Sequence, residues 1–184
     1  VVNVNPLYTP RELAYQLKDS GATAIVVLEN FAHTLAQVVE TTPIRTVITT
    51  QVGDLLPPLK RLLTNTVVKY VKKMVPPWQL DSAVDFKQVL AVGRAQSLQD
   101  VVLTHDDLAF LQYTGGTTGV AKGTMLTHGN MRSNAEMLRG YWQWQPNDVL
   151  IHALPIFHVH GLFVAIHGAL INGSKMIWLG KFDP

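Results

Sequence analysis

The sequence contains no cysteine among its 184 residues. A chain without cysteine has no disulfide framework, and it cannot hold a zinc ion through thiolates. This absence excludes the disulfide-stapled class of small secreted domains, and it fits a cytoplasmic protein.

Charged residues and long apolar runs are also scarce. Charged residues make up 15% of the chain and the net charge is only +2, which argues against a dedicated nucleic-acid-binding protein. No apolar run reaches the ~18 residues expected of a membrane-spanning helix, and no signal peptide is visible. The hydrophobic fraction of 47% instead indicates a globular domain with a sizeable core.

The first fifty residues alternate between strand and helix patterns. Thr9 is a helix N-cap, Pro10 follows at the first helical position, and Glu12 completes a capping box. Gly21 is expected to end that helix. We therefore predict an α/β fold with a mostly parallel sheet and flanking helices, with strands at 1–4, 24–28 and 46–49 and helices at 10–20 and 31–40.

Residues 51–99 depart from this pattern and are predicted to be a helical and irregular insertion. Within them, prolines bracket a segment at 59–75 whose apolar residues recur at helical spacing, while basic residues fall largely opposite. One interpretation is an ordinary surface helix that packs its apolar face on the domain. The other is a basic amphipathic helix that makes peripheral contact with an anionic membrane. The apolar set is Leu59, Leu62, Leu63, Val67, Tyr70, Val71 and Met74.

The stretch at 113–123 holds four glycines, three threonines and one lysine. Glycines let the backbone approach a ligand, successive backbone N–H groups form an anion site, and Lys122 adds a mobile positive charge. The stretch fits neither G-x-x-x-x-G-K-[ST] nor G-x-G-x-x-G. A flexible hairpin loop is the alternative to a phosphate-binding loop. Around it we predict strands at 108–113, 149–154 and 176–179 and helices at about 128–142 and 161–171.

Two histidines, His158 and His160, lie in a second notable stretch at 155–161. They could be read as metal ligands, with His167 as a third. A metal site is not favoured, because no cysteine or nearby carboxylate completes the set. A strand-to-helix turn without chemistry is the other alternative.

The residues at 113–123 resemble the signature phosphate loop of the adenylate-forming superfamily, which includes acyl-CoA ligases, peptide-synthetase adenylation domains and luciferase. Ala121 stands where the usual form has proline. The resemblance implies that the ATP phosphates are bound by Thr114, Gly115, Gly116, Thr117, Thr118, Gly119 and Lys122. Residues 153–158 resemble the motif that follows this loop in acyl-CoA ligases. That likeness implies a substrate pocket bordered by Phe157, His158 and Gly161, with Lys122 and His158 as the catalytic residues.

The two parts of the chain resemble different ligases. Residues 1–128 are most similar to bacterial long-chain fatty acyl-CoA ligases, and residues 130–184 resemble malonyl-CoA ligases more. The resemblance implies part of the N-terminal, AMP-binding domain, with residues 1–184 lacking the C-terminal domain. The implied substrates are a carboxylic acid, ATP and CoA, with Mg2+, but no metal ligand is assigned here.

The resemblance also sets limits on what the chain does alone. The family's remaining catalytic motifs are expected after residue 184, so we predict that the chain by itself is inactive. Homodimer formation and a location in the cytoplasm, peripheral to the inner face of the membrane, are further hypotheses. The alternative function is a non-catalytic nucleotide- or membrane-associated module with a vestigial phosphate loop. A peptide-synthetase adenylation domain is less favoured, because the flanking residues resemble fatty-acyl ligases.

Overall fold

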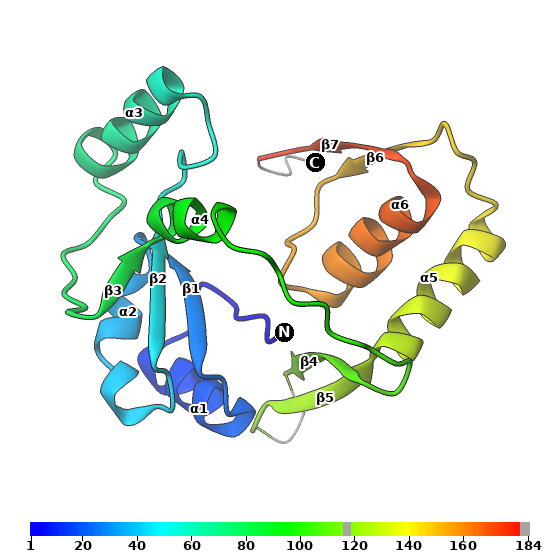
Figure 1. Cartoon of the computed structure of the whole chain (residues 1–184), viewed down its shortest axis with the longest axis horizontal. Helices are drawn as coiled ribbons and strands as arrows, with labels where there is room; N and C mark the ends of the chain where they lie inside the picture. Colours follow the sequence, from blue (N-terminus) through cyan, green and yellow to red (C-terminus); the bar gives the residue numbers. More distant parts are fainter. Residues whose placement is uncertain (116–118, 181–184) are drawn as a thin grey trace. The chain divides into compact units, whose positions relative to one another are not determined.

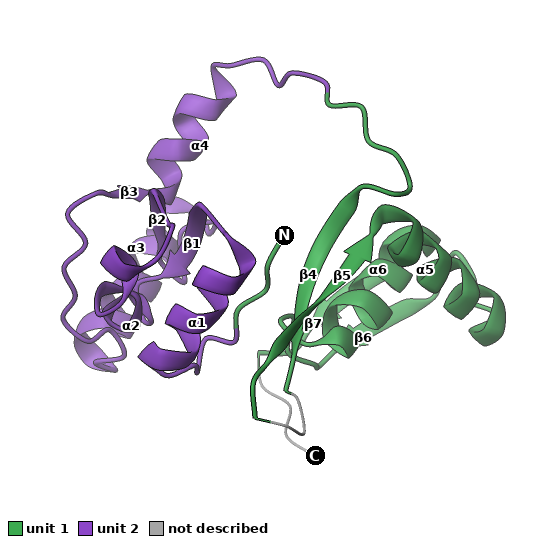
Figure 2. Cartoon of the chain, turned by 90° about the horizontal axis from the view of Figure 1, so that it is seen from below, with its two compact units in different colours: residues 1–4, 101–184 green, residues 5–100 purple. Residues whose placement is uncertain are grey.

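The computed structural model describes residues 1–115 and 119–180. The chain divides into two compact units, which are coloured separately in Figure 2. Unit 1 contains residues 1–4 and 101–184, and unit 2 contains residues 5–100. Both are α/β structures, as the sequence predicts (Figure 1).

Unit 2 is built on a three-stranded parallel sheet in the order β1-β2-β3. Its strands are β1 (Ala24–Leu28), β2 (Thr46–Thr50) and β3 (Ala83–Asp85). Its helices are α1 (Pro10–Ser20), α2 (Ala32–Ala36), the 3-10 turn η1 (Val39–Thr41), α3 (Pro58–Thr66), the π-helical turn η2 (Val67–Val71) and α4 (Phe86–Arg94). The parallel pairing of β2 with both β1 and β3 confirms the predicted arrangement.

The predicted capping box at the start of α1 is confirmed by both of its hydrogen bonds. The Thr9 amide donates to Glu12 Oε2 at 2.8 Å, and the Glu12 amide donates to Thr9 Oγ1 at 3.4 Å. Gly21 ends the helix with a φ of 63°. Local capping chemistry of this kind is readable from sequence because every partner lies within one helical turn.

The helix predicted at 31–40 is shorter than expected. It ends at Ala36, and a 3-10 turn follows. The hydroxyls of Thr41 and Thr42 donate to the carbonyl oxygens of Val38 and Val39, at 2.9 and 2.7 Å. Such local side-chain bonds offer the backbone an alternative to continued helix, and here they lie in the 3-10 turn that follows α2.

The range 51–99 contains more regular structure than the sequence predicts. Ala83–Asp85 pairs in parallel with β2 as the third strand, and α4 follows it at once. Asp85 caps α4 by accepting from the amides of Lys87 and Gln88, both at 3.0 Å. A three-residue strand is too short to give a periodic signal, so only its pairing identifies it.

Unit 1 contains two small sheets. An antiparallel pair joins β4 (Leu108–Thr114) to β5 (Lys122–Thr127), and a parallel pair joins β6 (Val149–His152) to β7 (Lys175–Trp178). Its helical elements are α5 (His128–Trp142), the π-helical η3 (His160–Ile166) and α6 (His167–Asn172). The predicted strand at 1–4 is reduced to one bridge, in which Val2 pairs with Leu111.

The core of unit 1 lies between the β4–β5 pair and the helices. Ala109, Met131 and Phe163 are buried together, and the rings of Phe110 and Phe163 meet edge to face at 5.1 Å. Ala109 and Phe110 belong to β4 and Leu126 belongs to β5, so the sheet that carries the loop at 113–123 packs against this core. In the described parts of the chain, no helix has the length and apolar character needed to cross a membrane.

The packing of unit 2 depends on α1. Leu17 is only 2% exposed, so Leu17→Ala is expected to lower the free energy of unfolding by about 2–5 kcal/mol through lost burial and a residual cavity. Urea denaturation of the chain measures this change. The matched control is Leu98→Ala at a position that is 94% exposed, where the change should stay within about 0.5 kcal/mol. Equal effects of the two substitutions would contradict this packing.

Candidate functional site

A β-hairpin positions the glycine- and threonine-rich loop. In the antiparallel pair, Tyr113 lies opposite Gly123, and Thr114 lies opposite Lys122. The loop at 115–121 therefore connects two paired strands at their open end. The two strands do form a hairpin, which was one of the two interpretations of this stretch. A hairpin is compatible with anion binding, because the strands fix both ends of the loop.

The described residues of the loop are open to solvent. Thr114, Gly115, Gly119 and Lys122 are all exposed. Gly119 has a φ of +96°, a backbone conformation that strains residues with a side chain. Gly116, Thr117 and Thr118, also predicted to bind phosphate, lie outside the described residues.

The loop brings together groups suited to a phosphate chain. Because Lys122 pairs across the hairpin with Thr114, an ammonium group and a hydroxyl come from facing positions of the two strands. Both can donate hydrogen bonds to phosphate oxygens, and the lysine also supplies charge. This arrangement can bind an anion without a carboxylate or metal ion in the hairpin.

The second predicted stretch follows the end of β6. The rings of Phe157 and His158 lie 4.6 Å apart at an angle of 44°. The His158 amide donates to the Pro155 carbonyl at 3.2 Å, so the segment forms a tight turn before η3. Phe157 is half-buried and His158 is exposed, which leaves the imidazole accessible from solvent.

Gly161 is required for the close packing of this turn. It is buried, and a Cβ atom built on it would overlap the carbonyl oxygen of Pro155 and lie 2.8 Å from the carbonyl carbon. No side chain fits at that distance unless the backbone moves. The sequence predicts Gly161 as part of a substrate pocket, and the structure gives it a definite role in the backbone of the turn.

His152 holds the turn from inside unit 1. It is 2% exposed, and its Nε2 lies 2.8 Å from the carbonyl oxygen of Gly161. Because a carbonyl oxygen only accepts, Nε2 carries the proton. The imidazole also stacks on Trp178 of β7, with ring centroids 4.3 Å apart. Sequence reasoning assigns no role to His152, because its partners are distant along the chain.

Gln112 connects the two predicted stretches. It is buried in β4, two residues before Thr114, and its Nε2 donates to the carbonyl oxygen of Phe157 at 3.4 Å. The strand that leads to the loop is thereby linked to the Phe157–His158 turn. The available signal in the sequence is a single amide within the otherwise apolar and aromatic run at 108–113.

The histidines do not form a metal site in the part of the chain that the structure describes, where no three His, Asp or Glu side chains cluster. His167 instead packs beside Phe110 and Phe163, at centroid distances of 5.8 and 5.5 Å. Burial lowers the pKa of His167 below its usual value. The neutral imidazole that results suits an aromatic environment. The roles predicted for Lys122 and His158 stay predictions.

Comparison with known proteins places this geometry in a family. The family described as AMP-binding enzymes matches the chain over residues 1–184. A long-chain-fatty-acid–CoA ligase of Yersinia pestis is 53% identical over 167 residues, which cover 89% of this chain and 30% of that protein. The chain therefore spans about a third of the length of such a relative.

Solved structures give the same result. Apo MatB from Rhodopseudomonas palustris superimposes with a TM-score of 0.69 and 33% identity, covering all of this chain and 30% of that one. A malonyl-CoA ligase complex with methylmalonyl-CoA and AMP superimposes with a TM-score of 0.60 and 26% identity, covering 99% and 30% of the two chains. The predicted resemblance to long-chain fatty acyl-CoA and malonyl-CoA ligases is confirmed.

Proposed function

This chain belongs to the family of AMP-binding enzymes, and we propose that it is the phosphate-binding part of an ATP-dependent acyl-CoA ligase. The observation that carries the proposal is the β4–β5 hairpin, which presents the loop at 113–123 between Thr114 and Lys122. The matched relatives are about three times as long, so the activity belongs to a longer protein that contains this chain.

The proposed reaction has two steps. A carboxylate oxygen attacks the α-phosphorus of ATP and pyrophosphate leaves, which gives an acyl adenylate. The sulfur of CoA then attacks the acyl carbon, AMP leaves, and the thiol proton is lost to solvent or a base. The first step brings two anions together, so it needs positive charge and hydrogen-bond donors around the phosphates.

The residues of the hairpin supply these groups. Lys122 neutralises charge on the departing pyrophosphate, and Thr114 donates a hydrogen bond from the facing strand. The amides of Gly115 and Gly119 are placed on the connecting loop, where no side chain obstructs a phosphate. Gly116, Thr117 and Thr118 complete the proposed phosphate-binding set.

The Phe157–His158 turn is proposed to border the carboxylic acid. Gln112 links the turn to β4, the strand that leads to the loop, through its hydrogen bond to the Phe157 carbonyl oxygen. The proposed acid-binding and phosphate-binding residues are therefore on elements that contact one another. We propose a fatty acid as the substrate, because the Yersinia pestis relative is a long-chain-fatty-acid–CoA ligase. A malonate-like acid is the alternative, and pocket shape discriminates acids only weakly, at ~1–3 kcal/mol per methylene.

Magnesium normally accompanies ATP in phosphoryl chemistry. Within residues 1–115 and 119–180, no cluster of three His, Asp or Glu side chains offers a site for it. The proposal therefore gives no residue of this chain the role of a magnesium ligand.

We expect the 184-residue chain alone to form no acyl-CoA above background, because it spans only about a third of its relatives. The longer protein should release pyrophosphate from ATP only when a carboxylic acid is present. A pyrophosphate assay with malonate, short fatty acids and long fatty acids measures both expectations and ranks the substrates. Thioester formation by the chain alone would contradict the first expectation. Nucleotide binding without acid-dependent pyrophosphate release would favour the non-catalytic module.

A further inference from the structure

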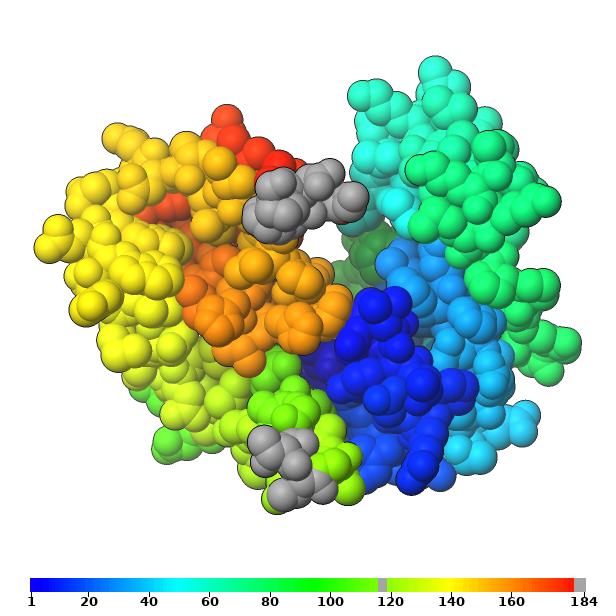
Figure 3. Space-filling model, turned by 180° about the vertical axis from the view of Figure 1, so that it is seen from behind, coloured from blue at the N-terminus to red at the C-terminus, as the bar shows by residue number. Residues whose placement is uncertain are grey.

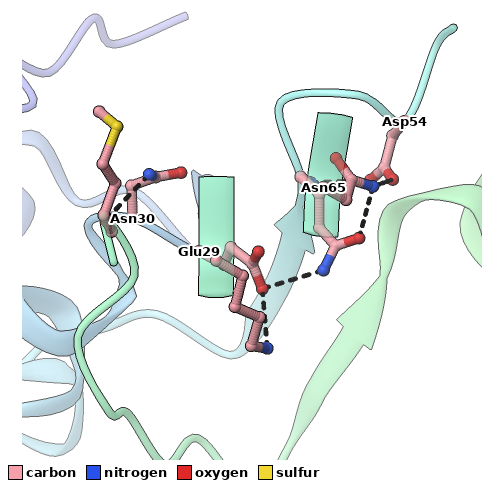
Figure 4. A network of polar contacts seen from close by, with 7 residues as sticks. Glu29, Asn30, Asp54 and Asn65 are labelled. Carbon is pink, nitrogen blue, oxygen red and sulfur yellow. Dashed lines mark hydrogen bonds and ion pairs between the residues drawn. The ribbon is translucent and has the colours of Figure 1, made fainter. Parts of the chain in front are cut away.

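The helical segment α3–η2 (residues 58–71) is attached to unit 2 through a polar side chain. Asn65 Oδ1 accepts from the Gly53 amide at 2.8 Å, and Asn65 Nδ2 donates to Gln51 Oε1 at 2.7 Å. The same Nδ2 lies 3.5 Å from Asp54 Oδ1. Figure 4 shows Asn65 and Asp54 pointing toward one another within this network.

An ion pair provides the second attachment. Lys69 Nζ lies 3.5 Å from Glu29 Oε2, and Gln51 Nε2 donates to the same oxygen at 3.0 Å. Glu29 is 4% exposed. A buried carboxylate without partners is costly, so these contacts hold the polar side of the segment against the unit (Figure 4).

The apolar side of the same segment faces solvent. Leu59 is 80% exposed, Leu63 65% and Tyr70 69%. An ordinary surface helix has the reverse orientation, with its apolar stripe on the core. The expectation that this helix packs its apolar face on the domain is therefore wrong. We call the exposed set the outward face, and it consists of Leu59, Leu62, Leu63, Tyr70 and Val71 of this segment, together with Met74 just after it.

The charges beside the outward face have one sign. Residues 55–80 contain no aspartate or glutamate. Lys60, Lys72 and Lys73 are exposed in the same stretch of chain, whereas Lys69 is used in the ion pair with Glu29. An apolar surface next to unpaired lysines matches the interface of an anionic bilayer, where acyl chains lie next to phosphate groups.

We propose that the outward face is a docking surface for an anionic lipid bilayer. The segment has nine residues in α3 and five in η2, which is well below the ~20 residues needed to span a bilayer. It lies flat on the interface, with the leucines and Tyr70 among the acyl chains and the lysines at the phosphates. The surface of this segment is visible in Figure 3, in the colours of residues 58–71.

Vesicle binding tests the proposal. The chain is sedimented with vesicles of equimolar phosphatidylglycerol and phosphatidylcholine, and with vesicles of phosphatidylcholine alone. We expect binding to the anionic vesicles that weakens as salt is added. Leu59→Glu together with Leu63→Glu should weaken it by about tenfold or more, because apolar burial drives interfacial binding. Leu98→Glu is the control, since Leu98 is also open to solvent but lies outside the face.

The lysines give a second, independent test. Lys60→Gln with Lys72→Gln should weaken binding to the anionic vesicles and leave the weak binding to phosphatidylcholine unchanged. Lys18→Gln, at another exposed lysine of unit 2, should have no effect. These substitutions are all at the surface, so circular dichroism and the melting temperature should not change. If the leucine pair destabilises the fold, the lysine pair still decides the outcome.

The longer protein that contains this chain is tested in the same way. Failure of the folded wild-type proteins to bind anionic vesicles would overturn the proposal. Equal binding by wild type and the leucine variant would also overturn it. A third outcome would overturn it as well. If the longer wild-type protein binds no lipid, and its leucine variant loses stability or changes oligomeric state, the outward face is covered by protein.

Discussion

Replacing Lys122 with alanine in the full-length protein is expected to slow acyl-adenylate formation by about 10²–10³-fold, the usual cost of removing one preorganised charged or polar group from a developing negative charge. Lys122 is exposed, and its side chain is not needed for the pairing of β5 with β4, which runs through the backbone. The fold should therefore survive. Acid-dependent pyrophosphate release measures the rate, and circular dichroism measures the fold.

Two variants make the result specific. Lys18→Ala removes an exposed lysine from the last turn of α1 and should leave the rate unchanged. Lys122→Arg keeps the positive charge but changes the geometry of its donors, so we expect partial activity. Pyrophosphate release by Lys122→Ala at the wild-type rate would refute the assignment of Lys122 to the phosphates.

The second large effect is expected at Gly161. In Gly161→Ala the new Cβ atom would overlap the oxygen of the Pro155 carbonyl and lie 2.8 Å from its carbon. These are backbone atoms, so the turn must open. We expect a loss of about 1–3 kcal/mol or more in the free energy of unfolding, as for other overpacked sites. Denaturant titration of the chain measures the loss.

A matched glycine in the same unit provides the control. Gly140 lies inside α5, and a Cβ atom built on it meets nothing within 4 Å. Gly140→Ala should therefore stabilise the chain by roughly 1 kcal/mol through helix propensity. If Gly161→Ala were as well tolerated as Gly140→Ala, the packing of the turn described here would be incorrect.

The opening of this turn should also affect the reaction. Gly161 is the partner of His152, and Pro155 is the partner of His158. A shift between them moves the Phe157–His158 turn, which is proposed to border the acid. In the full-length protein we expect a higher KM for the carboxylic acid in Gly161→Ala, measured where the variant is still folded.

Local signals in the sequence predict much of the fold. The capping residues Thr9 and Glu12 locate α1. The apolar run at 24–28 and the following run at 46–49 locate two parallel strands. In each case the information lies within a few residues, so no knowledge of distant partners is needed.

The orientation of α3–η2 shows what local signals leave open. Amphipathic spacing predicts that one side is apolar, but it does not say which side faces the protein. That choice depends on Glu29, which is 40 residues away from its partner Lys69 in the sequence. The same limit applies to β3, which is recognised only by its pairing with β2.

The candidate site also has a part that local sequence signals reveal and a part that they do not. Its loop is recognisable from composition because glycine, threonine and lysine are concentrated in 113–123. The supporting residues Gln112 and His152 are not, because their partners Phe157 and Gly161 lie on other elements. Sequence reasoning thus finds the groups that could touch a ligand more readily than the groups that hold them in place.

The pairing of the first residues with β4 has a consequence for the order of folding. The backbone nitrogen of Val1 donates to the Ala109 carbonyl across 108 residues of chain, and Val2 bridges Leu111. During synthesis, residues 1–4 leave the ribosome long before their partners exist. In the sequence, all residues of unit 2 come between residues 1–4 and their partners in β4. Unit 2 can therefore fold before those partners have been synthesised. Its folding shortens the effective loop that must close, so unit 1 is completed only after the residues of unit 2 have been synthesised.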